Sequence, residues 1–354
     1  MSDTVSLGPA RSDRSFWWWA GLMFTPVRLV AGFMFLSAFI RRVIQVPAKM
    51  DPNSAQYLGH KFSGFLPHAI VIKPLIAQLI QNPELLHPFL WFFTIMEGVV
   101  GLFLIVGFVT RLTALGSALL SAGILLGSGW LGSTCLDEWQ IGALLVAAGL
   151  AVAVTGSGPL SVDNWLLNRS ERLAQSSLFR WLFSGSLPVM NTRKLAVIVL
   201  TVTVLAGGTT LYTYQALHNG LWGKLHNDSK APHLTISQVV VNSNGSLHLD
   251  IYRDGGPDTY GSFIQEVRLT GQDGQVLADF DASYLSHVGA HDIENHMIYQ
   301  KVKAGPYGLI VPLAASATIH LTPAQSLSLP AGATVKVTIY DVSGASWSAS
   351  TTIQ

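Results

Sequence analysis

The only cysteine of this 354-residue chain, Cys135, stands in the stretch GSTCLDEWQI between two long apolar runs. A thiolate is a strong nucleophile, but the neighbouring carboxylates of Asp137 and Glu138 oppose thiol ionisation unless cations offset them. Two interpretations remain open: a nucleophile, or a small buried side chain at a helix end, which is the commoner role of a lone cysteine. A single cysteine excludes an internal disulfide and any four-thiolate metal or iron–sulfur site within one chain.

Two ionisable residues, Arg28 and Glu97, lie inside apolar runs. A charged side chain in a bilayer costs several kcal/mol unless it is paired or hydrated, so each is a candidate functional residue. Arg28 is about midway along the first run and Glu97 about nine residues into the second. Because these depths are comparable, the sequence permits an ion pair between them. The alternative for Arg28 is that its guanidinium reaches the nearer membrane surface.

A histidine-rich stretch, HVGAHDIENH, supplies His287, His291 and His296 together with two carboxylates. This spacing could hold zinc or copper, but a solvated loop is the interpretation we favour. No histidine falls inside a predicted span, which argues against a haem held within a helical bundle. The net charge of +1 gives no support for a nucleic-acid partner.

The composition predicts a membrane protein, because charged residues make up only 12% of the chain and the mean hydropathy is +0.41. Five apolar runs are long enough to span a membrane: Trp17–Ile40, Pro88–Thr110, Leu112–Leu131, Glu138–Gly156 and Leu195–Tyr214. A sixth apolar run, Ala69–Ile80, is too short to span and is expected to lie on the membrane or to fold back into the bundle.

The basic residues in the connections indicate how the spans are oriented. Most of them place the N-terminus in the cytoplasm, with the Cys135 loop and the C-terminal domain on the periplasmic side, although Arg41 and Arg42 favour the opposite orientation. The N-terminal residues lack a signal-peptide cleavage site, so the first run should remain as an anchor. We therefore expect a multi-pass protein of a bacterial inner membrane.

From His233 onward the hydrophobic period changes to two. The segments HLTISQVVV and SLHLDIYRD predict a hairpin that turns at Asn244-Gly245, and about eight short strands in roughly 120 residues suggest an immunoglobulin-like β-sandwich. The expected organisation is a four-span bundle at 1–160, a cytoplasmic amphipathic linker at 161–193, a fifth tether helix at 194–216 and a periplasmic sandwich at 230–354.

Several phrases resemble a known family. The stretch MEGVVGLFLIVGFVTRLTALGSALL, together with VRLVAGFMFLSAFIRR and DEWQIGALLVAAGLAVAVTGSGPLSVDNWL, is similar to the four-helix DoxX-like membrane proteins. The phrases IYRDGGPDTYGSFI, GPYGLIVPL and YDVSGASWS are similar to DoxA. Nearly the whole chain thus resembles a fusion of DoxD with DoxA, the subunits of thiosulfate:quinone oxidoreductase. The resemblance implies oxidation of two thiosulfates to tetrathionate, with membrane quinone as the electron acceptor.

The site residues are assigned by chemistry, since the resemblance transfers no catalytic residue. We expect the cations Arg41, Arg42, Lys73 and Arg28 to bind the thiosulfate dianion, and Glu97 to deliver protons to quinone. The thiolate of Cys135 would add to quinone, be attacked by one thiosulfate and be displaced by a second. Asp137 and Glu138 would handle protons or cap the following helix. No haem, flavin or metal is predicted, and the expected quinone-lining side chains are Trp91, Trp130 and Trp139.

Two other classes of function remain open. The chain could be a non-catalytic membrane subunit or scaffold whose sandwich docks a sulfur-oxidising or terminal oxidase complex. It could also be an anion transporter, although the outer domain does not require this. Besides thiosulfate, quinone and the lipid bilayer, the partners considered are a second copy of the chain and a terminal oxidase.

Overall fold

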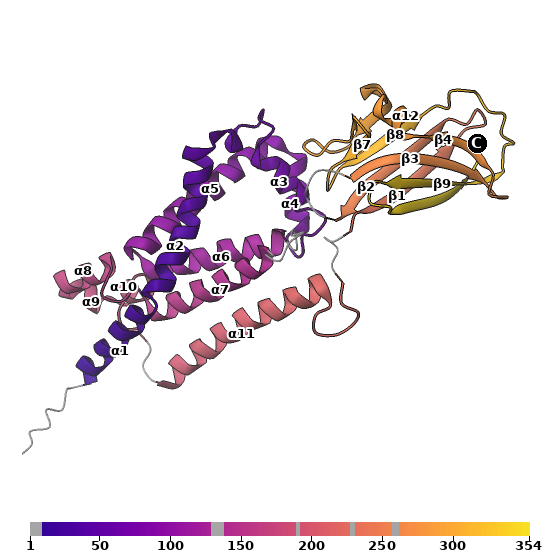
Figure 1. Ribbon diagram of the computed structural model, residues 1–354. Coiled ribbons are helices and arrows are strands. Elements are labelled where there is room, and N and C mark those ends of the chain that lie inside the picture. The colour runs from indigo at the N-terminus through magenta and orange to yellow at the C-terminus, as the bar shows by residue number, and fades with distance from the viewer. Residues whose placement is uncertain (1–8, 129–137, 189–191, 227–230, 257–261) are drawn as a thin grey trace, which may run out of the picture. The chain divides into compact units, whose positions relative to one another are not determined.

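The computed structural model describes residues 9–128, 138–188, 192–226, 231–256 and 262–354 (Figure 1). The chain divides into two compact units. The helical unit comprises Met1–Leu58, Glu84–Leu126 and Glu138–Lys224, and the β unit comprises Gly59–Pro83, Gly127–Asp137 and Leu225–Gln354. The helical region is thus followed by a β-sheet domain, and one early segment of the chain, 59–83, folds with that domain.

The helical unit begins with α1 and α2, and α2 continues into a π-helix, η1, and a short 3₁₀ helix, η2. Two long helices, α5 and α6, are followed by α7, by three short helices and by α11, which lies alongside α7 (Figure 1). The bounds are α1 Pro9–Met23, α2 Thr25–Ile40, η1 Arg41–Gln45, η2 Pro47–Met50, α5 Pro83–Val106, α6 Thr110–Ser128, α7 Glu138–Thr155, α8 Val162–Arg169, α9 Glu171–Gln175, α10 Ser177–Leu182 and α11 Thr192–His218.

Several of these helices have the length and composition of membrane spans. Among the described residues, Pro83–Val106, Thr110–Ser128 and Arg193–His218 qualify alone. Phe16–Met23 and Thr25–Gln45 qualify together as a fourth span that is bent by 46°, and the apolar helix Gln140–Thr155 is shorter. Five spans remain a prediction, but the membrane character of the helical unit follows from these helices.

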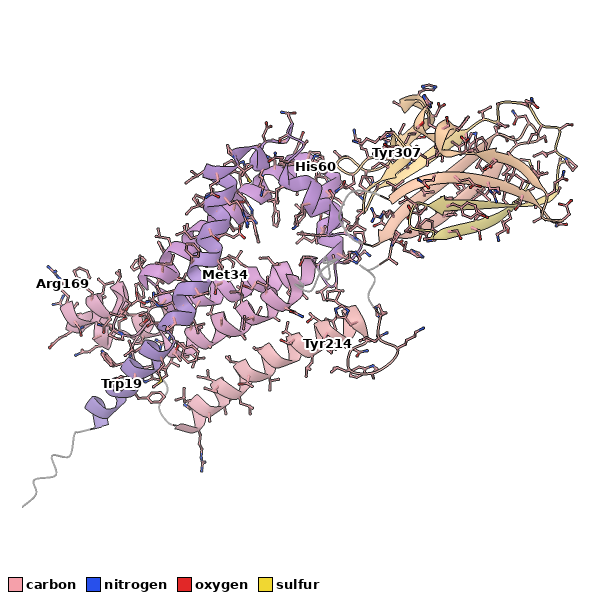
Figure 2. All side chains as sticks on the ribbon, in the orientation of Figure 1. Trp19, Met34, His60, Arg169, Tyr214 and Tyr307 are labelled. Carbon is pink, nitrogen blue, oxygen red and sulfur yellow. The ribbon has the colours of Figure 1, made fainter. Side chains whose placement is uncertain are left out.

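Close backbone contact joins α2 to α5. A Cβ added to Gly101 would lie 2.4 Å from the backbone nitrogen of Leu36 and 2.7 Å from the carbonyl oxygen of Gly32. Small residues at helix contacts are typical of membrane bundles, because packing rather than water exclusion holds the helices together. Large apolar side chains lie exposed on the outside of the unit, among them Trp19 and Met34 in Figure 2. This outward apolar surface suits a lipid environment.

The β unit contains two antiparallel sheets that share one hydrophobic core. The first has the strand order β1-β2-β8-β5, and the second has the order β10-β9-β3-β7-β6 with β4 paired to β3. The first sheet consists of β1 His233–Val241, β2 Leu247–Gly255, β8 Ser316–Leu321 and β5 Ile293–Asn295. The second consists of β10 Ser346–Thr352, β9 Thr334–Asp341, β3 Ser262–Gly271, β7 Gly308–Val311, β6 Lys303–Gly305 and β4 Val276–Phe280. A helix, α12 Ala282–Ser286, and a 3₁₀ turn, η3 Ala290–Asp292, follow β4.

Strand alternation explains this core. On β2, Leu247, Leu249 and Ile251 are fully buried, whereas His248 is exposed, as expected when successive side chains point to opposite faces. The predicted hairpin is confirmed: β1 pairs with β2, and Gly245 adopts the positive φ of +85° that the turn requires. The immunoglobulin-like assignment of the two sheets remains a prediction.

The segment 59–83 packs against the C-terminal part of the β unit. It contains α3, Leu58–Gly64, and α4, Lys73–Gln81. Buried residues of this segment, including Ile76 and Ile80, form a cluster that Met297 joins. His60 Nδ1 donates to the carbonyl oxygen of Tyr299 at 2.9 Å, and Gln300 Nε2 donates to the carbonyl oxygen of His60 at 2.7 Å. The apolar run Ala69–Ile80, expected on the membrane or in the bundle, is instead part of this cluster.

Candidate functional site

An ion pair between Arg42 and Glu97 lies inside the helical unit. Arg42 sits in η1, where the change from α- to π-helix follows α2, and Glu97 sits on α5. One guanidinium nitrogen of Arg42 donates to Glu97 Oε2. Glu97 is only 2% exposed. π-Helical turns are often found at functional sites, and a buried acid beside a cation is an arrangement suited to proton transfer.

The neighbouring glycine explains why Glu97 can face α2. A Cβ on Gly98 would lie 2.8 Å from the ring of Phe39, so only glycine allows this aromatic side chain of α2 to lie against α5. The helices therefore meet closely one residue from Glu97. This approach brings Arg42, in the π-helix η1 that continues α2, to the carboxylate.

Further polar groups follow the same face of α5. Thr94 Oγ1 donates to Met50 Sδ at 3.9 Å, and His87 Nδ1 lies 3.4 Å from the hydroxyl of Tyr57, a side chain that is 1% exposed. Positions 87, 94 and 97 share one face, because residues three and seven apart on a helix nearly align. Sequence analysis missed Tyr57 and Thr94, although the spacing of His87, Thr94 and Glu97 could have indicated a polar face.

The ion pair that the sequence permits between Arg28 and Glu97 does not form. Arg28 is 1% exposed and donates to the carbonyl oxygens of Leu104, Ile105 and Leu160, the last two at 2.9 and 2.7 Å. Carbonyls in the last turn of a helix lack partners within it, and Leu104 and Ile105 occupy the last turn of α5. Arg28 therefore ties α2 to the end of α5 and to the segment after α7, a structural role that leaves its substrate-binding role without support.

A buried polar cluster was not anticipated either. Asp163 is fully buried and accepts from the backbone nitrogens of Val109 and Thr110 at 2.9 and 3.0 Å and from Ser184 Oγ at 2.9 Å. It thus caps the N-terminus of α6 from a distant part of the chain. Burial raises the pKa of Asp163, and its hydrogen bonds act in the opposite direction. The sequence assigns Asp163 to an amphipathic linker and gives no sign of this long-range contact.

Arg111 completes this cluster. Its guanidinium donates to the carbonyl oxygens of Ala153 at 3.1 Å and Gly185 at 2.7 Å, and it lies 5.6 Å from the ring of Trp17. Arg111 is 2% exposed. Together, Arg111 and Asp163 join α6, α7 and the α8–α10 segment into one structure.

The other predicted site residues differ in their surroundings. Arg41 is exposed, and Lys73 is exposed on α4 in the β unit, where Nζ lies 3.5 Å from the carbonyl oxygen of Pro67. Trp91 is half-buried and lies six residues from Glu97 on α5, about 120° around the helix. Cys135, Trp130 and Asp137 lie outside the described residues. α7 begins at Glu138, but the side chains of Glu138 and Trp139 are likewise outside the description.

The histidine-rich stretch does not converge on a metal. His296 contacts the hydroxyls of Ser316 and Thr318, His287 contacts the carbonyl oxygen of Ser283, and His291 lies 3.2 Å from Asp292. In the ranges that the structure describes, no group of three or more metal-ligating side chains gathers.

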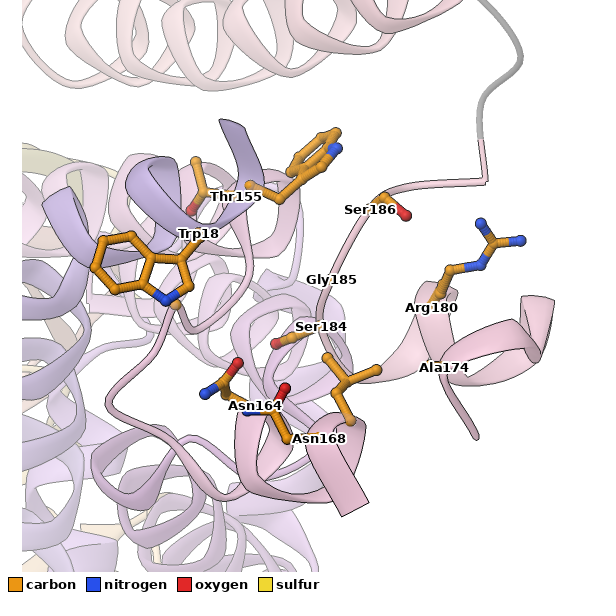
Figure 3. Close-up of a pocket in the computed structure, with 12 residues that line it drawn as sticks. Trp18, Thr155, Asn164, Asn168, Ala174, Arg180, Ser184, Gly185 and Ser186 are labelled. Atoms are coloured by element: carbon orange, nitrogen blue, oxygen red, sulfur yellow. The ribbon is translucent and has the colours of Figure 1, made fainter. Parts of the chain in front are cut away.

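A pocket of about 160 Å³ lies at the α8–α10 segment of the helical unit (Figure 3). In this view Asn164, Asn168 and Ser184 lie on one side, and Ser186 and Arg180 lie on the other. The full lining is Trp17, Trp18, Thr155, Gly158, Asn164, Leu167, Asn168, Ala174, Arg180, Ser184, Gly185 and Ser186.

A unit of apolar helices with a buried ion pair, joined to a domain of two β-sheets, defines a multi-pass membrane protein with an appended β domain. Two families match consecutive regions of the chain: TQO small subunit DoxD at residues 23–190 and TQO small subunit DoxA at residues 217–350. The chain belongs to the thiosulfate:quinone oxidoreductase family as a fusion of DoxD and DoxA.

Among solved structures, the chain is similar to the Iho670 flagellar-like filament, with 14% identity over 46% of this chain and 98% of that one. The TM-score of 0.19 is too low for this likeness to inform either fold or function.

Proposed function

We propose that this protein oxidises thiosulfate to tetrathionate at the periplasmic face of the membrane and reduces membrane quinone. The observation that carries the proposal is that families of both oxidoreductase subunits match one chain in succession. The buried pair of Glu97 and Arg42 supports it, because a quinone that gains two electrons also needs two protons, and an intramembrane acid can deliver them.

The reaction balances without a further reactant. Two thiosulfate dianions lose two electrons and become joined by a sulfur–sulfur bond as tetrathionate. Quinone takes up these two electrons and two protons and leaves as quinol. Glu97 would pass protons to the quinone oxygens, and Arg42 would hold the carboxylate in place between transfers.

Cys135 is the proposed link between the sulfur anion and the quinone. Its thiolate adds to the quinone ring, and one thiosulfate then attacks the cysteine sulfur, which releases quinol and leaves a cysteine S-thiosulfonate. A second thiosulfate attacks the sulfane sulfur, displaces the thiolate and forms tetrathionate. In this scheme Asp137 and Glu138 assist proton movement, and Trp130, Trp139 and Trp91 border the quinone.

The predicted orientation gives the remaining cations a role. With the N-terminus in the cytoplasm, the exposed side chains of Arg41 and Lys73 face the periplasm. Exposed cations raise the local concentration of a dianion and its rate of association. With this orientation, we propose that the protein lies in the inner membrane of a bacterium.

The direct test uses purified full-length protein with thiosulfate and decylubiquinone. Quinol and tetrathionate are followed together, and the expected result is one quinol for each tetrathionate. Quinol formation without tetrathionate would contradict the proposed sulfur product. If neither forms until a membrane extract is added, the chain is a non-catalytic subunit and the proposal fails.

A further inference from the structure

The pocket of Figure 3 presents hydrogen-bond donors without a carboxylate. The polar side chains that line it, Thr155, Asn164, Asn168, Ser184, Ser186 and Arg180, include no carboxylate, and the hydroxyl of Ser184 donates to the buried carboxylate of Asp163 behind the pocket. Arg180 is the only cation among the lining side chains. A lining of this kind favours a ligand that is itself an acceptor and negatively charged.

Arg180, which lines this pocket, carries one donor atom without a partner among the described residues. Its Nε is buried and has no hydrogen-bond partner within the part of the chain that the structure describes. A buried unsatisfied donor costs about 1–3 kcal/mol. Its backbone carbonyl oxygen accepts a hydrogen bond from Arg111, so the residue that carries the free donor is anchored to the buried polar cluster.

The chain segment that forms much of the pocket also exposes large apolar side chains. Leu160, Trp165, Leu178 and Trp181 are 65%, 55%, 68% and 47% exposed. Arg169 lies 5.2 Å from the ring of Trp165. Exposed tryptophans, leucines and arginines on short helices are typical of a membrane interface. A ligand here would therefore meet donors at its head and apolar side chains at its tail.

We propose that this pocket binds the headgroup of an anionic phospholipid. The phosphate would accept from Arg180 and Ser186, headgroup hydroxyls would contact Asn164 and Asn168, and the acyl chains would lie over the apolar side chains around the pocket. Basic pockets beside membrane helices are a recognised kind of lipid site. A quinone fits less well, because its carbonyl oxygens carry no charge to match the guanidinium. The proposal is independent of the oxidoreductase activity.

The test measures lipid binding to the delipidated full-length protein in neutral detergent. Phosphatidylglycerol, phosphatidylcholine, inorganic phosphate and decylubiquinone are each titrated, and thermal unfolding and native mass spectrometry report binding. The variant is Arg180→Gln. Arg172→Gln is the matched control, because Arg172 is exposed on the same short-helix segment and does not line the pocket. Asn168→Asp is a second variant that adds a repelling charge at an exposed position.

We expect the protein to prefer phosphatidylglycerol to phosphatidylcholine by roughly fivefold, the effect of one arginine near a lipid surface. Arg180→Gln and Asn168→Asp should lose this preference, and Arg172→Gln should keep it. Equal binding of the two lipids, or a preference that survives both pocket variants, would overturn the proposal. Stabilisation by phosphate alone equal to that by phosphatidylglycerol, or displacement of the lipid by decylubiquinone, would overturn it as well.

Discussion

Glu97 of α5 pairs with Arg42 of η1, the π-helix that continues α2, and not with Arg28 of α2. Two arginines of the first span therefore have different tasks. Arg28 binds main-chain carbonyls at one end of α5, and Arg42 binds the one carboxylate in the middle of that helix. This division decides which substitutions should affect chemistry and which should affect folding.

Replacing Glu97 by Gln should lower quinone reduction at least about 100-fold, because an amide cannot deliver protons and general acid–base groups contribute on this scale. The measurement is quinol formation at saturating thiosulfate. Thr94→Val, which removes a hydroxyl from the same face of α5, is the control and should retain most activity. Unchanged turnover in Glu97→Gln would exclude the carboxylate as the proton donor.

The ion pair between Arg42 and Glu97 should also affect stability. Removing one partner of a buried ion pair leaves a charge uncompensated and costs about 3 kcal/mol, whereas removing both costs far less. Thermal unfolding in detergent should therefore rank the double variant Arg42→Gln/Glu97→Gln above the single variant Glu97→Gln. Additive losses in the double variant would show that the two side chains are not coupled.

Arg28→Gln should destabilise the protein by about 3 kcal/mol, because a buried cation donates to three carbonyl oxygens and hydrogen bonds to charged groups are each worth more than neutral ones. The KM for thiosulfate should stay within about twofold. Unfolding temperature and steady-state kinetics check the two parts. A selective rise in KM at normal stability would restore the substrate-binding role.

Gly101→Ala should separate α2 from α5 and destabilise the helical unit by about 1–3 kcal/mol, since the new methyl group would meet the backbone of α2. Gly123 on α6 is the matched control, because a Cβ there meets nothing within 4 Å. Gly123→Ala should raise the unfolding temperature through helix propensity alone. Equal effects of the two substitutions in a thermal unfolding series would contradict the close helix contact.

Asp163 predicts a pH effect. Because burial raises its pKa, its contribution to stability is fully present below the ordinary pKa of an aspartate and is lost as pH rises through the folded-state pKa. The unfolding temperature of the wild type should therefore fall relative to that of Asp163→Asn as pH rises from about 4 to 7. The opposite trend would mean that the backbone donors and Arg111 keep the carboxylate ionised.

Much of the fold could be predicted because it depends on local patterns. Apolar runs located α2, α5, α6 and α11, and the period of two with Asn244-Gly245 located the β1–β2 hairpin. Depth arguments placed Arg28 and Glu97 at similar levels, but Arg28 meets the carbonyl oxygens of Leu104 and Ile105, seven and eight residues beyond Glu97 on α5, so the two side chains lie about two helical turns apart. The π-helical turn that presents Arg42 has no sequence pattern of its own, so the true partner of Glu97 could not be recognised.

The residues that were missed depend on contacts between distant parts of the chain. Asp163 meets the start of α6 from more than 50 residues away, and His60 meets Tyr299 and Gln300 across about 240 residues. Neither contact leaves a mark at the residue itself. Hydropathy correctly found the run Ala69–Ile80 too short to span, but it could not reveal that Met297 completes its core.

The pairing of His60 with Gln300 imposes an order on biosynthesis. At about 5–20 residues per second, a ribosome needs roughly 10–50 s to travel between these two positions. During that interval the connection between α2 and α5 has emerged but its partner has not been made. Until then the segment 59–83 has only its own apolar contacts and those of earlier residues, and a stop codon before Met297 would remove every contact that the β unit makes with it after that point.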